Sequence, residues 1–140
     1  MKILLAVDGS AHTKRMLDYL DGHDELFGAT PEYHVITVVP ALPQRVTRFV
    51  DGATFDLYYR EEAQRIMTPM QAFAEEHEWN LEVICALGNP GDVIAETAMS
   101  GNFDVLVMGS HGHSSIGNLL LGSVAMRVMA RCKTPVMIIR

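Results

Sequence analysis

Short apolar runs alternate along the chain with longer segments in which apolar residues recur at helical spacing. The runs are rich in Val and Ile, which favour the pleated, half-buried surface of a sheet. The run near residue 105 is almost wholly apolar, as expected for a strand covered on both faces. We therefore predict five β-strands, at residues 2–7, 33–39, 81–87, 103–108 and 136–139.

Helices are predicted in the segments between these strands. Ser10 can cap the first one, whose apolar face would consist of Met16, Leu17, Leu20 and Phe27. Further helices are predicted at residues 55–78, just after Pro90, and around residues 121–129. Residues 40–54 contain two prolines, a glycine and no apolar period, so we expect a long loop there.

The predicted helix at 55–78 contains a proline. Pro69 cannot donate a backbone hydrogen bond, and its ring collides with the preceding turn. Thr68 and Gln71 have the spacing of a capping box around a proline at the first helical position. The helix is therefore predicted to kink or restart at residues 68–69.

Regular alternation of strand and helix is typical of a parallel sheet with helices on both faces. The chain has 140 residues, of which 49% are hydrophobic, enough for one α/β domain over residues 1–140 with a single core. In such sheets, ligands bind beyond the carboxyl ends of the strands, where the strand order reverses. The loops after Val7, Val39 and Met108 are the candidate binding loops.

Charge and composition exclude several classes of partner. The net charge is −6, so nucleic acid and anionic membranes are poor partners. No apolar run approaches the ~18 residues of a membrane helix, and Asp8 ends the apolar start well short of the ~7–15 residues of a signal peptide core. We expect a cytoplasmic protein. Cys85 and Cys132 have neither CxxC nor metal-site spacing and are expected to be reduced, buried thiols.

The segment from Gly109 to Ser123 has the strongest functional signal. It contains four glycines, four serines and two histidines between an apolar strand and an amphipathic helix. Glycine permits positive φ and close approach of a ligand to the backbone, so that N–H groups can form an anion-binding hollow. Gly122 and Ser123 add N–H groups and a hydroxyl at a helix N-terminus, which favours phosphate. The composition also fits a simple turn, and neither GxxxxGK[ST] nor GxGxxG is present.

The spacing Gly109-x2-Gly112-x9-Gly122-Ser123 matches G-x2-G-x9-G-[S/T], the ATP-binding pattern of the universal stress protein family. The chain also resembles this family outside the motif. Residues 2–10 are similar to its opening strand and acidic turn, and residues 88–90 to the turn after its third strand. Residues 104–110 and 134–140 resemble its fourth and last strands.

This resemblance implies a Rossmann-like, HUP-type nucleotide-binding fold with strand order 3-2-1-4-5. It also implies a homodimer paired through the last strand, residues 136–139, and a role in stress survival. The implied ligand is ATP. Because the chain is acidic and the glycine segment has no fixed cation, we expect Mg²⁺ to accompany ATP, held by the phosphates near Asp8. Asp8 itself could hold ribose or a metal-bound water, or cap the first helix.

The residues of the binding site follow from the same resemblance. The motif glycines, Ser123 and Val124 would line the phosphates and ribose, Asp8 would contact the nucleoside, and Val38 would lie against adenine. With Met108 and His113, the predicted site consists of Asp8, Val38, Met108, Gly109, Gly112, His113, Gly122, Ser123 and Val124.

The glycine segment contains no Lys or Arg, although cleavage of a γ-phosphate needs neutralised charge and an oriented nucleophile. His113 and His111 could each donate to a phosphate. Arg127 lies on the face of the helix that carries Ser123 and could reach a phosphate or lie in solvent. Arg45 and Arg48 of the long loop could close over a ligand or remain solvated.

Such a site should bind ATP more readily than it cleaves it, so we predict a nucleotide-responsive sensor or switch with no catalytic residue. Its partners would be ATP, a second copy and an unidentified protein. A slow Mg²⁺-dependent ATPase and a nucleotide-free interaction module or electron-transfer domain remain alternatives. An adenylyl-transfer enzyme is disfavoured because the chain has neither an SGGxDS-type loop nor a HIGH motif.

Overall fold

The computed structural model describes residues 1–113 and 120–140 of the chain. Five strands form one sheet in the order β3-β2-β1-β4-β5, and every pairing is parallel. This confirms the predicted fold class and strand order. The strands are β1 (Lys2–Ala6), β2 (Glu32–Val39), β3 (Asn80–Leu87), β4 (Val105–Gly109) and β5 (Val136–Ile139).

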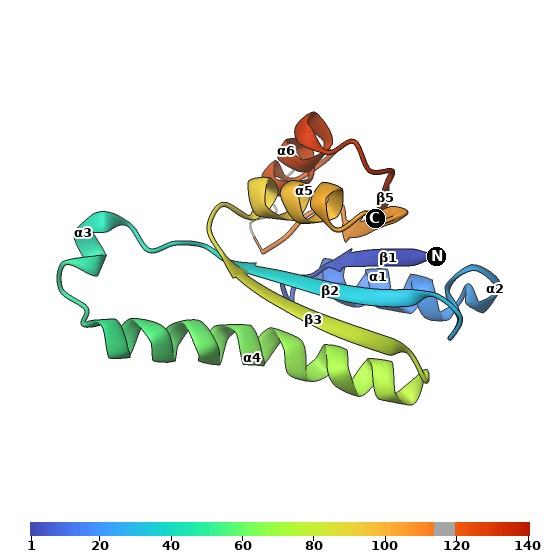
Figure 1. Cartoon of the computed structure of the whole chain (residues 1–140), viewed down its shortest axis with the longest axis horizontal. Helices are drawn as coiled ribbons and strands as arrows, with labels where there is room; N and C mark the ends of the chain where they lie inside the picture. The colour runs from blue at the N-terminus through green and yellow to red at the C-terminus, as the bar shows by residue number, and fades with distance from the viewer. Residues whose placement is uncertain (114–119) are drawn as a thin grey trace.

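Helices cover both faces of the sheet (Figure 1). They are α1 (Ala11–Asp21), α2 (Asp24–Phe27), α3 (Gln44–Thr47), α4 (Gly52–Glu76), α5 (Pro90–Ser100) and α6 (Ser123–Arg131). One apolar layer packs α1 and α4 on the sheet, and the other packs α5 and α6 on its opposite face. Ile3 and Leu5 of β1 belong to the first layer, whereas Leu4 belongs to the second.

The first helix begins as predicted but ends sooner. The Ser10 hydroxyl accepts a hydrogen bond from the His12 N–H at 3.2 Å, which confirms the cap. The helix ends at Asp21, where the Gly22 N–H bonds the Asp18 carbonyl. Phe27 is buried as expected, but it belongs to the separate short helix α2.

The predicted loop at 40–54 is wrong at both its middle and its end. It contains α3, and α4 already begins at Gly52. Asp51 caps α4 by accepting a hydrogen bond from the Thr54 N–H at 2.8 Å. This local cap adds residues 52–54 to the helix, and because all three are exposed they give no apolar period that marks them as helical.

The predicted restart at Pro69 is also wrong. A single helix of 25 residues runs from Gly52 to Glu76 with Pro69 inside it. The Thr68 hydroxyl donates to the Gln64 carbonyl at 2.9 Å instead of capping a second helix. Met67 and Met70 are buried on either side of the proline, so packing on the sheet holds the helix together across it.

The cysteines are less buried than predicted. Cys85 is exposed and Cys132 is half-buried, and both are free thiols. Cys85 lies on β3, which forms an edge of the sheet and is only partly covered. Apolar neighbours in the sequence do not bury an edge strand.

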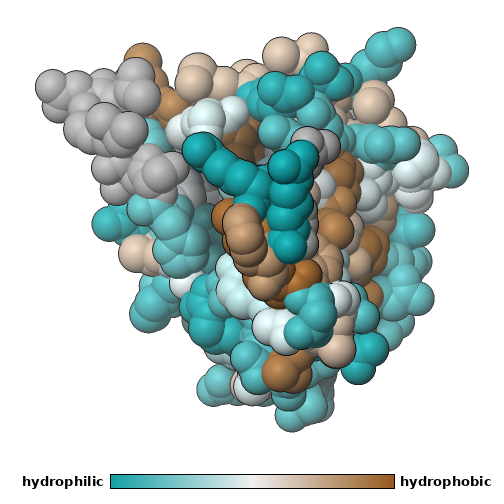
Figure 2. All heavy atoms as spheres, turned by 90° about the vertical axis from the view of Figure 1, so that its left-hand side faces the viewer, coloured by the Kyte–Doolittle hydropathy of each residue, from teal (hydrophilic) through white to brown (hydrophobic). Residues whose placement is uncertain are grey.

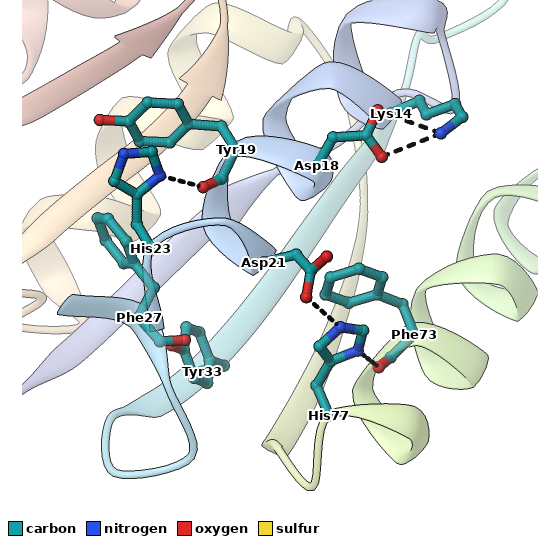
Figure 3. A network of polar contacts seen from close by, with 9 residues as sticks. All are labelled: Lys14, Asp18, Tyr19, Asp21, His23, Phe27, Tyr33, Phe73 and His77. Atoms are coloured by element: carbon teal, nitrogen blue, oxygen red, sulfur yellow. Dashed lines mark hydrogen bonds and ion pairs between the residues drawn. The ribbon is translucent and has the colours of Figure 1, made fainter. Parts of the chain in front are cut away.

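His77 joins the C-terminal ends of α1 and α4 (Figure 3). Its Nε2 lies 2.7 Å from Asp21 Oδ1, and its Nδ1 lies 2.8 Å from the Phe73 carbonyl. Hydrogen bonding to the Phe73 carbonyl, and then to Asp21, raises the pKa of His77 above its usual value.

Candidate functional site

The strand order reverses between β1 and β4, and a hollow opens there at the carboxyl ends of the strands. Its volume is about 280 Å³, close to the lower end of the ~300–1,000 Å³ typical of small-molecule sites. Figure 2 looks onto this end of the molecule, where apolar surface lies between hydrophilic margins.

All of the residues predicted to form the site line this one hollow. They come from the turn after β1, from β2 and β4, from the segment after β4 and from the start of α6. They are Asp8, Val38, Met108, Gly109, Gly112, His113, Gly122, Ser123 and Val124. Residues 114–119, which belong to the predicted glycine segment, lie outside the described residues.

Asp8 is held by hydrogen bonds in the turn that leads from β1 to α1. Its Oδ1 accepts hydrogen bonds from the Ser10 N–H and the Thr13 hydroxyl, both at 3.0 Å. The turn requires Gly9, which has a φ of 73°, in the left-handed region that favours glycine. The Asp8 carboxylate therefore braces the start of α1 and still lines the hollow.

The motif glycines permit close contacts between segments. A Cβ on Gly112 would lie 2.5 Å from Asp8 Oδ2, and one on Gly109 would lie 2.8 Å from His12 Cβ. Positive φ was the other expected reason for glycine. In the described parts of the chain, however, the glycines with positive φ are Gly9 and Gly88. Space for the backbone, and not left-handed geometry, explains Gly109 and Gly112.

The first turn of α6 presents hydrogen-bond donors to the hollow. Gly122 is the N-cap, and no described side chain caps this helix. The Gly122 N–H bonds the Ser110 carbonyl at 2.8 Å, which leaves the following N–H groups and the Ser123 hydroxyl for a ligand. Uncapped N–H groups at a helix start favour an anion.

The two histidines of the glycine segment have different surroundings. His113 Nε2 lies 2.7 Å from the Asp8 carbonyl oxygen, which ties the segment to the turn after β1. His111 Nδ1 lies 3.1 Å from the Ser110 hydroxyl. The His111 ring lies 5.3 Å from the ring of His12, centroid to centroid. Of the two, His113 was the predicted site residue, and both line the hollow.

The structure adds an acidic residue that the sequence analysis missed. Glu62 of α4 lines the hollow together with Ile66. Arg65 donates to both oxygens of Glu62, with Nη2–Oε1 at 2.5 Å and Nε–Oε2 at 3.3 Å. These bonds lower the pKa of Glu62. No motif marks Glu62, because its place in the hollow depends on where α4 crosses the sheet.

Arg127 does not line the hollow. Its Nε and Nη2 each lie 2.7 Å from an oxygen of Asp92 on α5, and Arg131 Nε lies 3.1 Å from the same carboxylate. Of the two sequence alternatives for Arg127, the solvent-exposed side chain is confirmed, since 46% of it is exposed. It also forms an ion pair that joins α6 to α5. Arg45 and Arg48 are exposed and also lie outside the lining.

A parallel sheet of this order with a ligand-sized hollow at its switch point is the architecture of nucleotide-binding-like α/β proteins. Residues 1–140 match the Universal stress protein family, and the chain belongs to that family. In the described residues, no helix combines the length and the apolar character needed to span a membrane.

Two relatives indicate how the chain compares in length. The Universal stress protein Slr1230 of Synechocystis is 29% identical over 141 residues; the match covers 99% of this chain but 42% of that protein. A universal stress protein of Thermus aquaticus is 28% identical over 139 residues, covering 99% of this chain and 97% of the relative.

Solved structures of similar proteins share the fold. The structure of MJ0577, a protein of Methanocaldococcus jannaschii, has a TM-score of 0.77 and 26% identity, covering 99% of this chain and 94% of its own. A universal stress protein in complex with cAMP has a TM-score of 0.60 and 25% identity, covering 100% and 96%. That relative binds an adenine nucleotide.

Proposed function

We propose that this protein binds ATP in the hollow between β1 and β4 and acts as a nucleotide-responsive sensor or switch in stress survival. The observation that carries the proposal is the convergence of Asp8, three motif glycines and the start of α6 on one hollow. The family membership and the relative that binds cAMP support an adenine nucleotide as the ligand.

The chemistry of the lining suits the three parts of ATP. Apolar Val38 and Met108 offer a surface for the base. The N–H groups at the start of α6 and the Ser123 hydroxyl offer donors to phosphate oxygens. Mg²⁺ would be held by the phosphates near Asp8, whose Oδ2 is a hard oxygen ligand of the kind that this ion prefers.

The proposal extends to the assembly and its location. A second copy would pair through β5, which lies at the edge of the sheet with Val136, Met137 and Ile138 only half-buried. We propose a cytoplasmic homodimer that signals to a further protein. Sedimentation velocity at several concentrations, with and without ATP, tests the dimer.

The direct test is to denature protein purified without added nucleotide and to identify what is released. Release of ATP or another adenine nucleotide, together with saturable ATP binding by calorimetry, would support the proposal. A flavin, or a folded protein that neither releases nor binds an adenine nucleotide, would favour the electron-transfer or interaction-module alternative.

A further inference from the structure

A carboxylate–guanidinium pair on α4 lies at the rim of the hollow beside Asp8. Glu62 lines the hollow, and its side chain is 33% exposed. A Cβ on Gly9, the residue after Asp8, would lie 3.8 Å from Arg65 Nη1. Nearby His113 also contributes to lowering the pKa of Glu62. Three separate elements thus meet around Glu62.

Arg65 keeps Glu62 ionised and oriented. Its two hydrogen bonds reach both carboxylate oxygens, and this bonding is the main cause of the lowered pKa of Glu62. A carboxylate offers about four lone-pair sites, and the fork of Arg65 uses two of them. Glu62 therefore retains acceptor capacity for a ligand.

The carboxylates that line the hollow suit the sugar hydroxyls of a nucleotide and repel its phosphates. A carboxylate accepts hydrogen bonds from neutral hydroxyl groups but repels phosphate oxygens. Asp8 has only limited capacity for this task, because its Oδ1 already accepts two hydrogen bonds within its own turn. Glu62 supplies a further acceptor in the same hollow, while the donors at the start of α6 suit the phosphates.

We infer that Glu62, positioned by Arg65, accepts a hydrogen bond from a sugar hydroxyl of the bound nucleotide and so disfavours nucleotides that lack this hydroxyl. This inference deepens the proposed function and rests on it. Glu62 is a specificity-determining residue of the site, and Arg65 acts through it as a positioning residue.

The test measures selectivity and not affinity alone. Calorimetry would compare ATP, 2′-deoxyATP and 3′-deoxyATP on the full chain and on Glu62→Gln, with Glu61→Gln as matched control. Glu61 is the exposed neighbour on α4 and does not line the hollow. Glutamine keeps the shape of Glu62 but removes its charge, which also weakens repulsion of the phosphates. The ratio of the dissociation constants for a deoxynucleotide and for ATP cancels this change in repulsion, because all three nucleotides carry the same phosphates.

We expect the wild-type protein to prefer ATP over at least one of the deoxynucleotides by roughly tenfold, as for the loss of a hydrogen bond to a charged group. That ratio should fall clearly in Glu62→Gln, because a neutral amide oxygen is a weaker acceptor than a carboxylate, and should stay unchanged in Glu61→Gln. Arg65→Gln should retain a preference near neutral pH but lose it at a higher pH than wild type on acidification. The reason is that the pKa of Glu62 would no longer be lowered by Arg65. Arg65→Lys should restore part of the wild-type profile.

The outcomes separate this inference from the function on which it rests. Tight binding of all three nucleotides with equal affinity, or a ratio unchanged in folded Glu62→Gln, would overturn the role of Glu62 and leave ATP binding in place. An Arg65→Gln profile identical to that of wild type would overturn the role of Arg65. Failure of the wild-type protein to bind any of the three would overturn both the proposed function and this inference.

Discussion

Gly122 lies where the chain turns into α6 and has little room for a side chain. An added Cβ would lie 3.1 Å from His111 Cα and 3.3 Å from the Ser110 carbonyl oxygen. A valine would fill the space beside the N–H groups of α6, where we propose that the phosphates bind. We expect Gly122→Val to abolish ATP binding with the fold intact, as measured by calorimetric titration and circular dichroism.

Gly52 provides the control for this substitution. An added Cβ there meets nothing within 4 Å, so Gly52→Val should retain ATP binding. Undiminished affinity in a folded Gly122→Val protein would exclude the first turn of α6 as the phosphate site.

Ser123 is exposed at the first position of α6. If its hydroxyl donates to a phosphate, Ser123→Ala should weaken ATP binding roughly ten- to a hundredfold, since a hydrogen bond to a charged group contributes ~1.5–3 kcal/mol. Adenosine should bind equally well to both proteins. Titration with the two ligands measures the difference, and equal losses for both would place Ser123 away from the phosphates.

At the scale of single elements, Pro69 is a local defect in α4 that the surrounding packing tolerates. A proline inside a helix is about 3 kcal/mol less favourable than alanine, partly offset by ~0.4–1 kcal/mol because proline restricts the unfolded chain. Pro69 is exposed, so alanine meets no steric obstacle. Pro69→Ala should raise the free energy of unfolding by about 1–3 kcal/mol in urea denaturation. An unchanged or lower value would show that α4 requires the proline.

His77 makes the contact between α1 and α4 depend on pH (Figure 3). Its folded pKa is raised above 6.5, first by the Phe73 carbonyl and also by Asp21. The contribution of protonated His77 to the stability of the folded protein is therefore fully present below pH 6.5 and is lost as pH rises through its folded pKa. Asp21 is 55% exposed, so the effect should be small. His77→Gln should flatten the pH dependence of unfolding above pH 6.5, with His23→Gln as control; unchanged pH dependence would contradict this role.

At the scale of the whole molecule, charge governs how ATP would bind. The chain has a net charge of −6, and the described residues that line the hollow include Asp8 and Glu62 but no lysine or arginine. Backbone donors and the dipole of α6 offset about 0.3–2 kcal/mol of the repulsion. Chelation of Mg²⁺ should therefore reduce ATP affinity more than roughly tenfold, because the metal would no longer neutralise part of the charge of the phosphates. Titrations with and without EDTA measure this.

Hydrolysis of ATP should be slow because the described lining of the hollow contains no lysine or arginine. Cleavage needs stabilised charge and a positioned water. His113 is the candidate base of the glycine segment, but its Nε2 lies 2.7 Å from the Asp8 carbonyl oxygen and is therefore already hydrogen-bonded. We expect turnover well below the ~10 s⁻¹ of a median enzyme. Steady-state phosphate release beside His113→Ala tests this. Turnover of several per second that vanished in the mutant would identify an ATPase.

The sequence by itself determined the strands, the fold class and the composition of the motif. These properties are local: period-two and period-3.6 patterns reflect which face of an element is buried, and the glycine spacing lies within one segment. Even helix α1 could be placed from its cap at Ser10. The residues proposed for the site were named from the resemblance to the universal stress protein family. The fold class added that ligands bind at the carboxyl edge of the sheet, where the strand order reverses.

Only the tertiary structure decided what depends on contacts between distant segments. Packing on the sheet kept α4 continuous through Pro69, and a place at the sheet edge exposed Cys85. The crossing of α4 brought Glu62 to the hollow, and the packing of α5 against α6 paired Arg127 with Asp92. Such contacts leave no periodic or motif signature, because they depend on where whole helices lie on the sheet and not on the residues beside them in the chain.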